Sequence, residues 1–433
     1  MKGVHLKSPL TCDVETVGTP FDGRIVTLGW QELGSRPHVA RFEDVPESAF
    51  DMMVDPDRPF VSHTKYDARF LRLGYGVPVT GPLYDTQVMA WMLNENQSLA
   101  LDSLVLRYCK YKMDKRIRRI EGRVLFLCDD ESVVPLDEAP IDQVYAYNMR
   151  DVEAETELFE TLYERLLDSG WLDYFLHEAV PYTEVLLDME CRGFPIDLKR
   201  TAVFAEEEEI AHSRMDEELH TTGNLPESFN LNSNDQLAAY LFAPKVFELL
   251  DDLDVGTDVC ECVKSCLKGE HEDCESGQHM KDLLPVGFTI DRVGRTQIHG
   301  RWTLRSRGLK PGVRTESGKL SVSRPALRGN FSTASDEWCQ QLLEYKQVDK
   351  LLTTYLRKFP KVAVETPRVV GSSSASGDEG CNGSVGVSTR IFGRFNQTGT
   401  KTGRLSSSDP NLQNIPTRGD LGSRVRDLFR TVT

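Results

Sequence analysis

The chain has 433 residues, of which 39% are hydrophobic and 27% are charged, and this composition is typical of a globular protein with several domains. No apolar run approaches the roughly 18 residues of a membrane span, and the N-terminus lacks the apolar stretch of a secretory signal. The net charge of −16 is unevenly distributed, because residues 301–433 carry +11 and the first 300 residues carry −27. A basic C-terminal third suits a surface that binds phosphates.

Short apolar runs alternate with helical patterns over the first part of the chain, which predicts an α/β fold with a mixed sheet covered by helices. Residues 24–30 read as a strand. Residues 152–167 place apolar side chains on one face, as in an amphipathic helix. Pro9 is expected to lie inside the strand that precedes Asp13, so we expect an edge or shortened strand there. Further helical spacing occurs at 67–73, 86–93 and 99–108.

From about residue 171 the pattern becomes mainly helical. Residues 255–280 form a polar insert rich in Cys and His. Residues 371–388 are rich in Gly and Ser, which predicts a mobile loop. Residues 389–397 beyond it could form a strand. The helical stretches are 176–191, 198–220 and 334–358.

Acidic residues stand at three places where they could converge. Asp13 and Glu15 follow a short strand, in which residues two apart point to the same face. If residues 147–151 are helical, Tyr147 and Asp151 lie one turn apart. Asp67 precedes another helical stretch. Converging carboxylates repel one another unless cations neutralise them, and oxygen ligands suit Mg²⁺ or Mn²⁺.

In chain order, these places are Asp13 with Glu15, then Asp67, then Tyr147 with Asp151. This order resembles the DEDD exonuclease superfamily, in the branch with tyrosine four residues before the last aspartate. Residues 62–71 resemble the second exonuclease motif, and residues 84–104 resemble the next segment of the proofreading domains of DNA polymerases. The resemblance implies a ribonuclease-H-like 3′→5′ exonuclease domain over residues 1–170, which hydrolyses phosphodiesters with two Mg²⁺ or Mn²⁺ ions. Its expected metal ligands are Asp13, Glu15, Asp67 and Asp151.

The same resemblance assigns roles to three further residues. Tyr147 is expected to orient the attacking water, because it is too weakly acidic to act as a base at neutral pH. His63 stands where this motif usually has asparagine, and it is expected to hold substrate or the surrounding loop. Lys65 is expected to contact the single-stranded 3′ end of DNA.

Residues 395–416 contain Thr-Gly-Thr-Lys-Thr-Gly-Arg-Leu-Ser-Ser and Pro-Asn-Leu-Gln-Asn-Ile-Pro. This string resembles the signature of family A DNA polymerases, the bacterial DNA polymerase I type. Residues 229–237, 314–321 and 342–355 resemble segments of that family's thumb and its junction with the palm. The resemblance implies that residues 171–433 form a mostly helical thumb and a partial palm. Its expected contacts to primer-template DNA are Arg314, Lys319, Lys346, Arg404, Gln413 and Asn414.

The printed sequence ends at Thr433, before the catalytic palm carboxylates and the fingers of that family. We therefore expect no nucleotide incorporation by this polypeptide alone. A separate C-terminal chain would complete a split enzyme, and a degenerate remnant is the alternative. An exonuclease without a preceding domain fits a phage-like polymerase that acts in the cytoplasm of a bacterial host.

The insert at 255–280 offers several soft ligands at short spacing. This pattern suits a structural Zn²⁺ site, although a merely cysteine-rich solvated insert would also explain it. The four expected ligands are Cys262, Cys266, His271 and Cys274.

Two rival functions stay open at this point. A ribonuclease D-like RNA exonuclease shares the acidic set but leaves the 395–416 string unexplained. A non-enzymatic DNA-binding subunit would use residues 301–433 to clamp duplex DNA, with steep salt dependence and no effect of Asp13→Ala.

Overall fold

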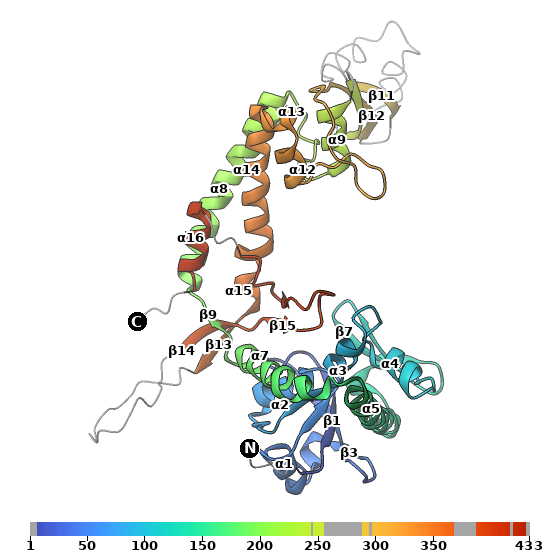
Figure 1. Ribbon diagram of the computed structural model, residues 1–433. Helices are drawn as coiled ribbons and strands as arrows, with labels where there is room; N and C mark the ends of the chain where they lie inside the picture. The colour runs from blue at the N-terminus through green and yellow to red at the C-terminus, as the bar shows by residue number, and fades with distance from the viewer. Residues whose placement is uncertain are drawn as a thin grey trace, which may run out of the picture. The chain divides into compact units, whose positions relative to one another are not determined.

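A computed structural model describes residues 7–243, 246–254, 288–293, 297–367, 387–415 and 419–429. They belong to two compact units, Met1–Leu198 with Lys361–Thr433, and Lys199–Pro360 (Figure 1). The first unit is therefore discontinuous in sequence, because the second is inserted into it. The division at residue 170 was based on motifs, and it stays a prediction.

A mixed five-stranded sheet forms the centre of the first unit, in the order β3-β2-β1-β4-β5. β1 is antiparallel to β2 and parallel to β4. The strands are β1 (Leu10–Val17), β2 (Arg24–Glu32), β3 (His38–Arg41), β4 (Phe60–Ser62) and β5 (Leu83–Asp85).

The expectation of an edge or shortened strand before Asp13 is wrong, since β1 is the central strand and has eight residues. Pro9 lies just outside the strand, where its missing N–H interrupts no ladder bond. Its carbonyl accepts a hydrogen bond from the N–H of Leu33 at 2.9 Å.

Helices cover both faces of this sheet. Leu10, Cys12 and Val14 of β1 pack on one face with α1 (Glu47–Met53) and α2 (Tyr66–Tyr75). The other face carries α3 (Thr86–Leu93), α4 (Leu101–Tyr108) and α5 (Ile141–Ser169). The mixed α/β layers predicted from the sequence are thus confirmed.

Helix α5 begins eleven residues before the predicted 152–167 segment. Its first turns bury polar side chains, including Asn148 and Asp151, so they show no apolar stripe in the sequence. The helix ends at Gly170, whose φ of 78° is the left-handed conformation that favours glycine.

Smaller elements complete the first unit. β6, β7 and β8 form a separate three-stranded sheet, and β13-β14-β9 form another. The predicted strand 389–397 is divided into β14 and β15 by Phe392 and Gly393. Residues 371–386 of the predicted mobile loop lie outside the described residues, and 387–388 belong to β14. The bounds are β6 (Ile117–Ile120), β7 (Arg123–Leu127), β8 (Val133–Pro135), α6 (Leu172–Tyr174), α7 (Val180–Arg192), β9 (Phe194–Pro195), β13 (Ala363–Pro367), β14 (Val387–Ile391), β15 (Arg394–Asn396), β16 (Ser406–Ser408) and α16 (Gly419–Asp427), with short 3₁₀ turns at Phe42–Asp44 and Leu136–Glu138 and a π turn at Phe175–Ala179.

The second unit is built on two long helices, α8 (Leu198–Gly223) and α14 (Glu337–Leu351). They run antiparallel, because Trp338 donates to the carbonyl of Leu219 at 3.0 Å, while Arg357 reaches Glu209 at 3.0 Å. The shorter helical elements are α9 (Asn234–Phe242), α12 (Arg324–Gly329), α13 (Phe331–Ala334), a π turn at Leu352–Leu356 and α15 (Phe359–Val362), which spans the boundary between the units.

A three-stranded sheet in the second unit was not predicted. Its order is β10-β12-β11, with β10 (Val246–Asp254), β11 (Phe288–Val293) and β12 (Gln297–Arg305). The predicted insert 255–280, with Cys262, Cys266, His271 and Cys274, lies outside the described residues. Across the part of the chain that is described, no helix is both long enough and apolar enough to cross a membrane.

Candidate active site

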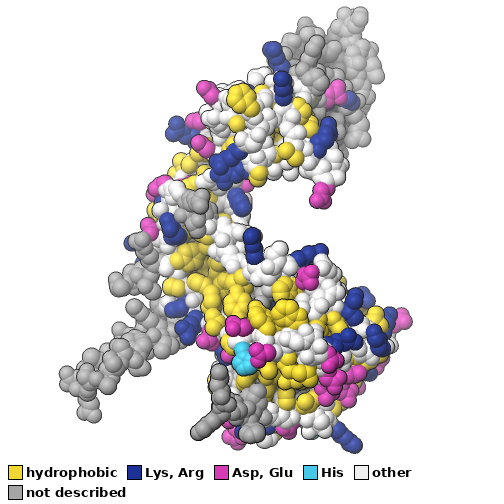
Figure 2. Space-filling view, in the orientation of Figure 1, with side chains coloured by type: hydrophobic (Ala, Val, Ile, Leu, Met, Phe, Trp, Pro, Cys, Tyr) yellow, Lys and Arg dark blue, Asp and Glu magenta, His cyan; other side chains and the backbone are white. Residues whose placement is uncertain are grey.

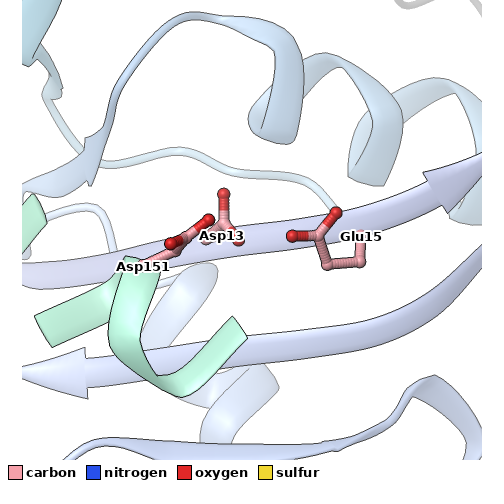
Figure 3. Close-up of side chains that lie close together, drawn as sticks. All are labelled: Asp13, Glu15 and Asp151. Carbon is pink, nitrogen blue, oxygen red and sulfur yellow. The ribbon is translucent and has the colours of Figure 1, made fainter. Parts of the chain in front are cut away.

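The alternation of side chains along β1 directs Asp13 and Glu15 toward α5. Their neighbours Cys12 and Val14 belong to the core of the opposite face. A carboxylate oxygen from each of Asp13, Glu15 and Asp151 lies within 4.8 Å of the others. Figure 3 shows the first two on one strand and Asp151 on the adjacent helix. The pairing expected from a two-residue strand period is therefore present.

Asp67 lies beside this group of three. It occupies the first turn of α2, is 6% exposed, and its Oδ1 accepts a hydrogen bond from the N–H of Val14 at 3.2 Å. Burial, followed by the charge of Asp13, raises the pKa of Asp67 well above its usual range. All four predicted carboxylates thus meet around β1, three of them as one cluster.

The electrostatics of the cluster fit a divalent cation. Burial raises the pKa of Asp13 to about 6, and burial with the charge of Asp13 raises the pKa of Asp151 to about 8. The pKa of Glu15 also lies well above its usual range, because of burial and then the neighbouring carboxylates. Buried like charges are unfavourable, and a cation bound to hard oxygen donors relieves them. The donor set suits Mg²⁺ or Mn²⁺.

Tyr147 lies one turn before Asp151 on α5 and packs edge-on against Phe126 of β7, at 6.0 Å between ring centroids. Burial, followed by the charges of Asp151 and Glu15, raises the pKa of Tyr147. Its hydroxyl therefore remains a hydrogen-bond donor at neutral pH. A cavity of about 480 Å³ adjoins Tyr147 and Asp151 and is also lined by Tyr111, Lys112 and Arg150.

Two residues that shape the site were missed by sequence reasoning. Asn148, which is fully buried, donates from Nδ2 to Oδ2 of Asp13 at 2.5 Å. Gly29 pairs with Asp13 across β1 and β2, and a Cβ there would lie 2.9 Å from Oδ1 of Asn148 and 2.6 Å from Val152. The glycine thus lets α5 approach the sheet. The adjacency of Asn148 to Tyr147 was the available signal for the first residue.

His63 and Lys65 both have contacts within the first unit. The ring nitrogens of His63 face Oγ1 of Thr86 at 3.0 Å and the carbonyl of Leu99 at 2.9 Å. Burial lowers the pKa of His63 to about 4, so the ring is neutral at pH 7. These contacts suit the loop-holding alternative for His63. Lys65 donates to the carbonyl of Phe395 at 2.9 Å.

The residues predicted to contact primer-template DNA lie in both units. In the first unit, Arg404, Gln413 and Asn414 are exposed. In the second, Arg314 donates to the carbonyl of Gly318 at 2.6 Å, and Lys319 forms a surface ion pair with Asp235 at 2.9 Å. Lys346 on α14 is partly buried. Figure 2 shows that the visible face of each unit carries exposed lysine and arginine side chains.

Two known families match separate parts of the chain. The family described as DNA polymerase family A matches residues 302–433, and the family described as 3′-5′ exonuclease matches residues 44–167. The second match includes Asp67, Tyr147 and Asp151. Asp13 and Glu15 lie before it, so their place in the site rests on the geometry described above.

Individual relatives agree with these matches. Thermostable DNA polymerase I of Thermus filiformis is 32% identical over 63% of this chain and 22% of its own length. DNA polymerase I of Chloroflexus aurantiacus is 25% identical over 87% of this chain and 30% of its own length. The chain therefore spans less than a third of the length of these curated relatives.

A solved structure supports the fold. The POL domain of Pol1 from M. smegmatis, in complex with DNA primer-template and dNTP, covers 98% of this chain with a TM-score of 0.62. The two are 19% identical in sequence, and the match spans 55% of the solved chain. At that identity the likeness concerns the fold alone.

Proposed function

Because the chain belongs to the family A DNA polymerases and carries their 3′-5′ exonuclease domain, we propose that it removes nucleotides from DNA 3′ ends by two-metal hydrolysis of phosphodiesters. The observation that carries this proposal is the convergence of Asp13, Glu15 and Asp151 within 4.8 Å, with Asp67 beside them. These four carboxylates are the proposed ligands of two Mg²⁺ or Mn²⁺ ions.

Bound divalent ions would supply Lewis-acid stabilisation and lower the pKa of bound water. The chain's own residues hold the carboxylates, orient the water and receive the nucleotide. The central position of β1 and the packing of α5 hold the carboxylates together, so little reorganisation is needed when substrate binds. The Tyr147 hydroxyl, protonated at neutral pH, is proposed to donate a hydrogen bond that orients the attacking water. The cavity beside Tyr147 and Asp151 is proposed to receive the terminal nucleotide.

Substitution of Asp13 tests this proposal. Asp13→Ala should abolish the Mg²⁺-dependent removal of 3′ nucleotides from single-stranded DNA, while Asp51→Ala, on the exposed side of α1, should leave it unchanged. Digestion by Asp13→Ala at the wild-type rate would refute the assignment. It would favour the DNA-binding subunit as the alternative function.

The choice of DNA over RNA is also part of the proposal. The match of residues 302–433 to DNA polymerase family A favours DNA over the ribonuclease D-like alternative. Digestion of DNA and RNA oligonucleotides of one sequence, compared under one set of conditions, tests this choice. Faster removal of ribonucleotides would favour the alternative.

The polymerase segment is proposed to bind primer-template DNA. The proposed contacts to primer-template DNA are those of Arg314, Lys319, Lys346, Arg404, Gln413 and Asn414, whereas His63 and Lys65 of the exonuclease domain are proposed to contact the single-stranded 3′ end. DNA synthesis is proposed to depend on a separate C-terminal polymerase chain as a partner. Primer extension with and without such a chain tests this dependence. We place the proposed activity in the cytoplasm.

The zinc site remains a proposal as well. Its ligands would be Cys262, Cys266, His271 and Cys274, which lie outside the described residues. Metal analysis of the purified chain, with and without the insert 255–280, tests whether Zn²⁺ is bound.

A further inference from the structure

A buried ionic cluster joins three segments of the first unit that are far apart in sequence. Its centre is Glu190 of α7, whose side chain is 3% exposed. One carboxylate oxygen accepts the N–H of Phe395 at 2.8 Å and lies 3.3 Å from Nζ of Lys65. The other oxygen lies 3.7 Å from Nε of Arg69. Glu190 therefore ties α2 to residues 391–398, the polymerase-signature segment, which overlaps the start of the 395–416 string.

The backbone of that segment is held from both sides. Lys65 donates to the carbonyl of Phe395 at 2.9 Å, so Lys65 and Glu190 both form hydrogen bonds with the backbone of Phe395. Arg69 also reaches the carbonyl of Phe392 at 3.4 Å. Lys65 and Arg69 flank Asp67 at two residues on either side, in the first turns of α2. The contacts that hold this segment therefore also fix the turn that presents Asp67.

Neighbouring contacts are polar as well. Thr398 donates to Gln87 of α3 at 2.9 Å, and Thr183 of α7 donates to Gln397 at 2.8 Å. The guanidinium of Arg394 lies over the ring of Tyr66 at 5.6 Å. A polar cavity of about 130 Å³ lies among these groups. Buried charges and amides tolerate few alternative partners, so they specify one register of docking.

We propose that Glu190 is a positioning residue for the exonuclease metal site. It forms ion pairs with Lys65 and Arg69 and binds the N–H of Phe395, and thereby makes the placement of Asp67 depend on the docked segment 391–398. The inference rests on the proposed function, since it concerns the same site. It implies that a displacement of the segment that leads to Arg404 would weaken metal binding at Asp67.

The test uses the full chain and the variants Glu190→Gln and Lys65→Met. The control is Asp188→Asn, because Asp188 also lies on α7 and pairs with Arg72 of α2 at 2.9 Å, but at the surface. We expect Glu190→Gln and Lys65→Met to lower the affinity for Mn²⁺, measured by calorimetry, by roughly tenfold, as for other residues that orient metal ligands. In Glu190→Gln, kcat on single-stranded DNA should fall while KM is kept. Asp188→Asn should match the wild type.

Hydrogen exchange provides a readout that needs no activity. Glu190→Gln should speed exchange in both 64–71 and 391–398, whereas Asp188→Asn should not. Wild-type affinity for Mn²⁺ in Glu190→Gln would overturn the inference, and so would an equal loss of affinity in Asp188→Asn.

A double variant separates positioning from general stability. Lys65→Met combined with Glu190→Gln removes two opposite charges. The melting temperature of this double variant should therefore partly recover relative to that of Glu190→Gln alone. A positioning role predicts that the affinity for Mn²⁺ stays low, and recovery of both would overturn that role. A wild-type chain that binds Mn²⁺ but digests no DNA would refute the proposed function. The positioning role of Glu190 would then still be decided by the Mn²⁺ affinities of the variants.

Discussion

The side-chain amide of Asn148 donates a 2.5 Å hydrogen bond to Oδ2 of Asp13, and so links the central strand to α5 at the metal site. Oδ1 of the same buried amide has no hydrogen-bond partner among the residues that the structure describes. Asn148 therefore acts mainly as a donor. Several consequences of this arrangement can be measured.

Replacement of Asn148 by Leu should make the exonuclease more sensitive to acid. The hydrogen bond lowers the pKa of Asp13 against the effect of burial, so its loss raises that pKa further. At pH 6 a larger fraction of Asp13 is then protonated, and activity should fall by roughly tenfold or more. At pH 8 the loss should be smaller. Pre-steady-state digestion of single-stranded DNA between pH 5.5 and 9 measures this. Met149→Ala, at the exposed next position, is the control. A profile for Asn148→Leu that is parallel to the wild type at every pH would contradict the prediction.

The metal-free protein should lose stability as pH rises. Carboxyl groups with raised pKa values in the folded state favour folding while they are protonated, and this contribution is lost as pH rises through the folded values. For Asp13 and Asp151 the folded pKa values are about 6 and about 8, against an ordinary value of 3.8, so the loss falls between about pH 4 and about pH 8. Melting temperatures in chelator at pH 5, 6.5 and 8 test it.

Mn²⁺ should reverse this loss of stability at pH 8, because an ion that binds only the folded state stabilises that state. In Asp13→Asn both the pH dependence and the rescue by Mn²⁺ should shrink. If chelated wild-type protein melts at the same temperature throughout this range, the electrostatic account of the cluster is wrong.

Gly29→Ala should destabilise the first unit and disturb the site together. The new Cβ would meet Cγ2 of Val152 at 2.6 Å and Oδ1 of Asn148 at 2.9 Å, so α5 must move away from the sheet. Overpacking of this kind costs about 1–3 kcal/mol. Urea unfolding measures the cost, and a lower affinity for Mn²⁺ should accompany it. Gly329→Ala, where a Cβ would meet nothing within 4 Å, is the matched control and should be tolerated. Equal stability of the two variants would show that the helix is not seated closely against β2.

Tyr147→Phe should lower kcat more than it lowers metal affinity, although loss of its hydrogen bond to Asp151 raises the pKa of that ligand. The hydroxyl is expected to orient water, whereas the ring keeps its packing against Phe126. Loss of such a group costs on the order of 10- to 100-fold in rate, at the low end of acid–base and orienting effects. Tyr145→Phe serves as the control, because the Tyr145 hydroxyl accepts the N–H of Arg41 at 3.2 Å at the surface. Single-turnover digestion with saturating Mg²⁺ distinguishes the two. A loss of metal affinity in Tyr147→Phe as large as the loss in kcat would instead assign the hydroxyl to the structure of the metal site.

The sequence was informative where the relevant pattern is local. The two-residue strand period correctly placed Asp13 and Glu15 on one face, and the four-residue helix period placed Tyr147 over Asp151. Pro9 was misleading, because whether proline limits a strand depends on whether it lies inside the ladder or one residue before it. That difference is set by tertiary pairing.

Contacts that span large sequence separations could not be predicted. The hydrogen bond from Lys65 to the carbonyl of Phe395 joins residues 330 positions apart, and no local sequence pattern at either residue indicates this contact. Gly29 is informative only once α5 is known to cross β2 there. The sheet of β10, β11 and β12 was missed for a related reason. The polar insert separates β10 from its partner β12 in the sequence, whereas β11 and β12 pair locally.

The insertion of one unit inside the other also bears on how the protein is made. During synthesis α2 and its Lys65 leave the ribosome some 330 residues before Phe395. Domains fold largely as they emerge, but this one must wait for its last strands. Until then Glu190 lacks the backbone N–H that it binds in the finished fold. A nascent chain should therefore acquire its sheet early and a competent nuclease site only after Phe395 and its neighbours have been made, which would keep the nuclease inactive until then.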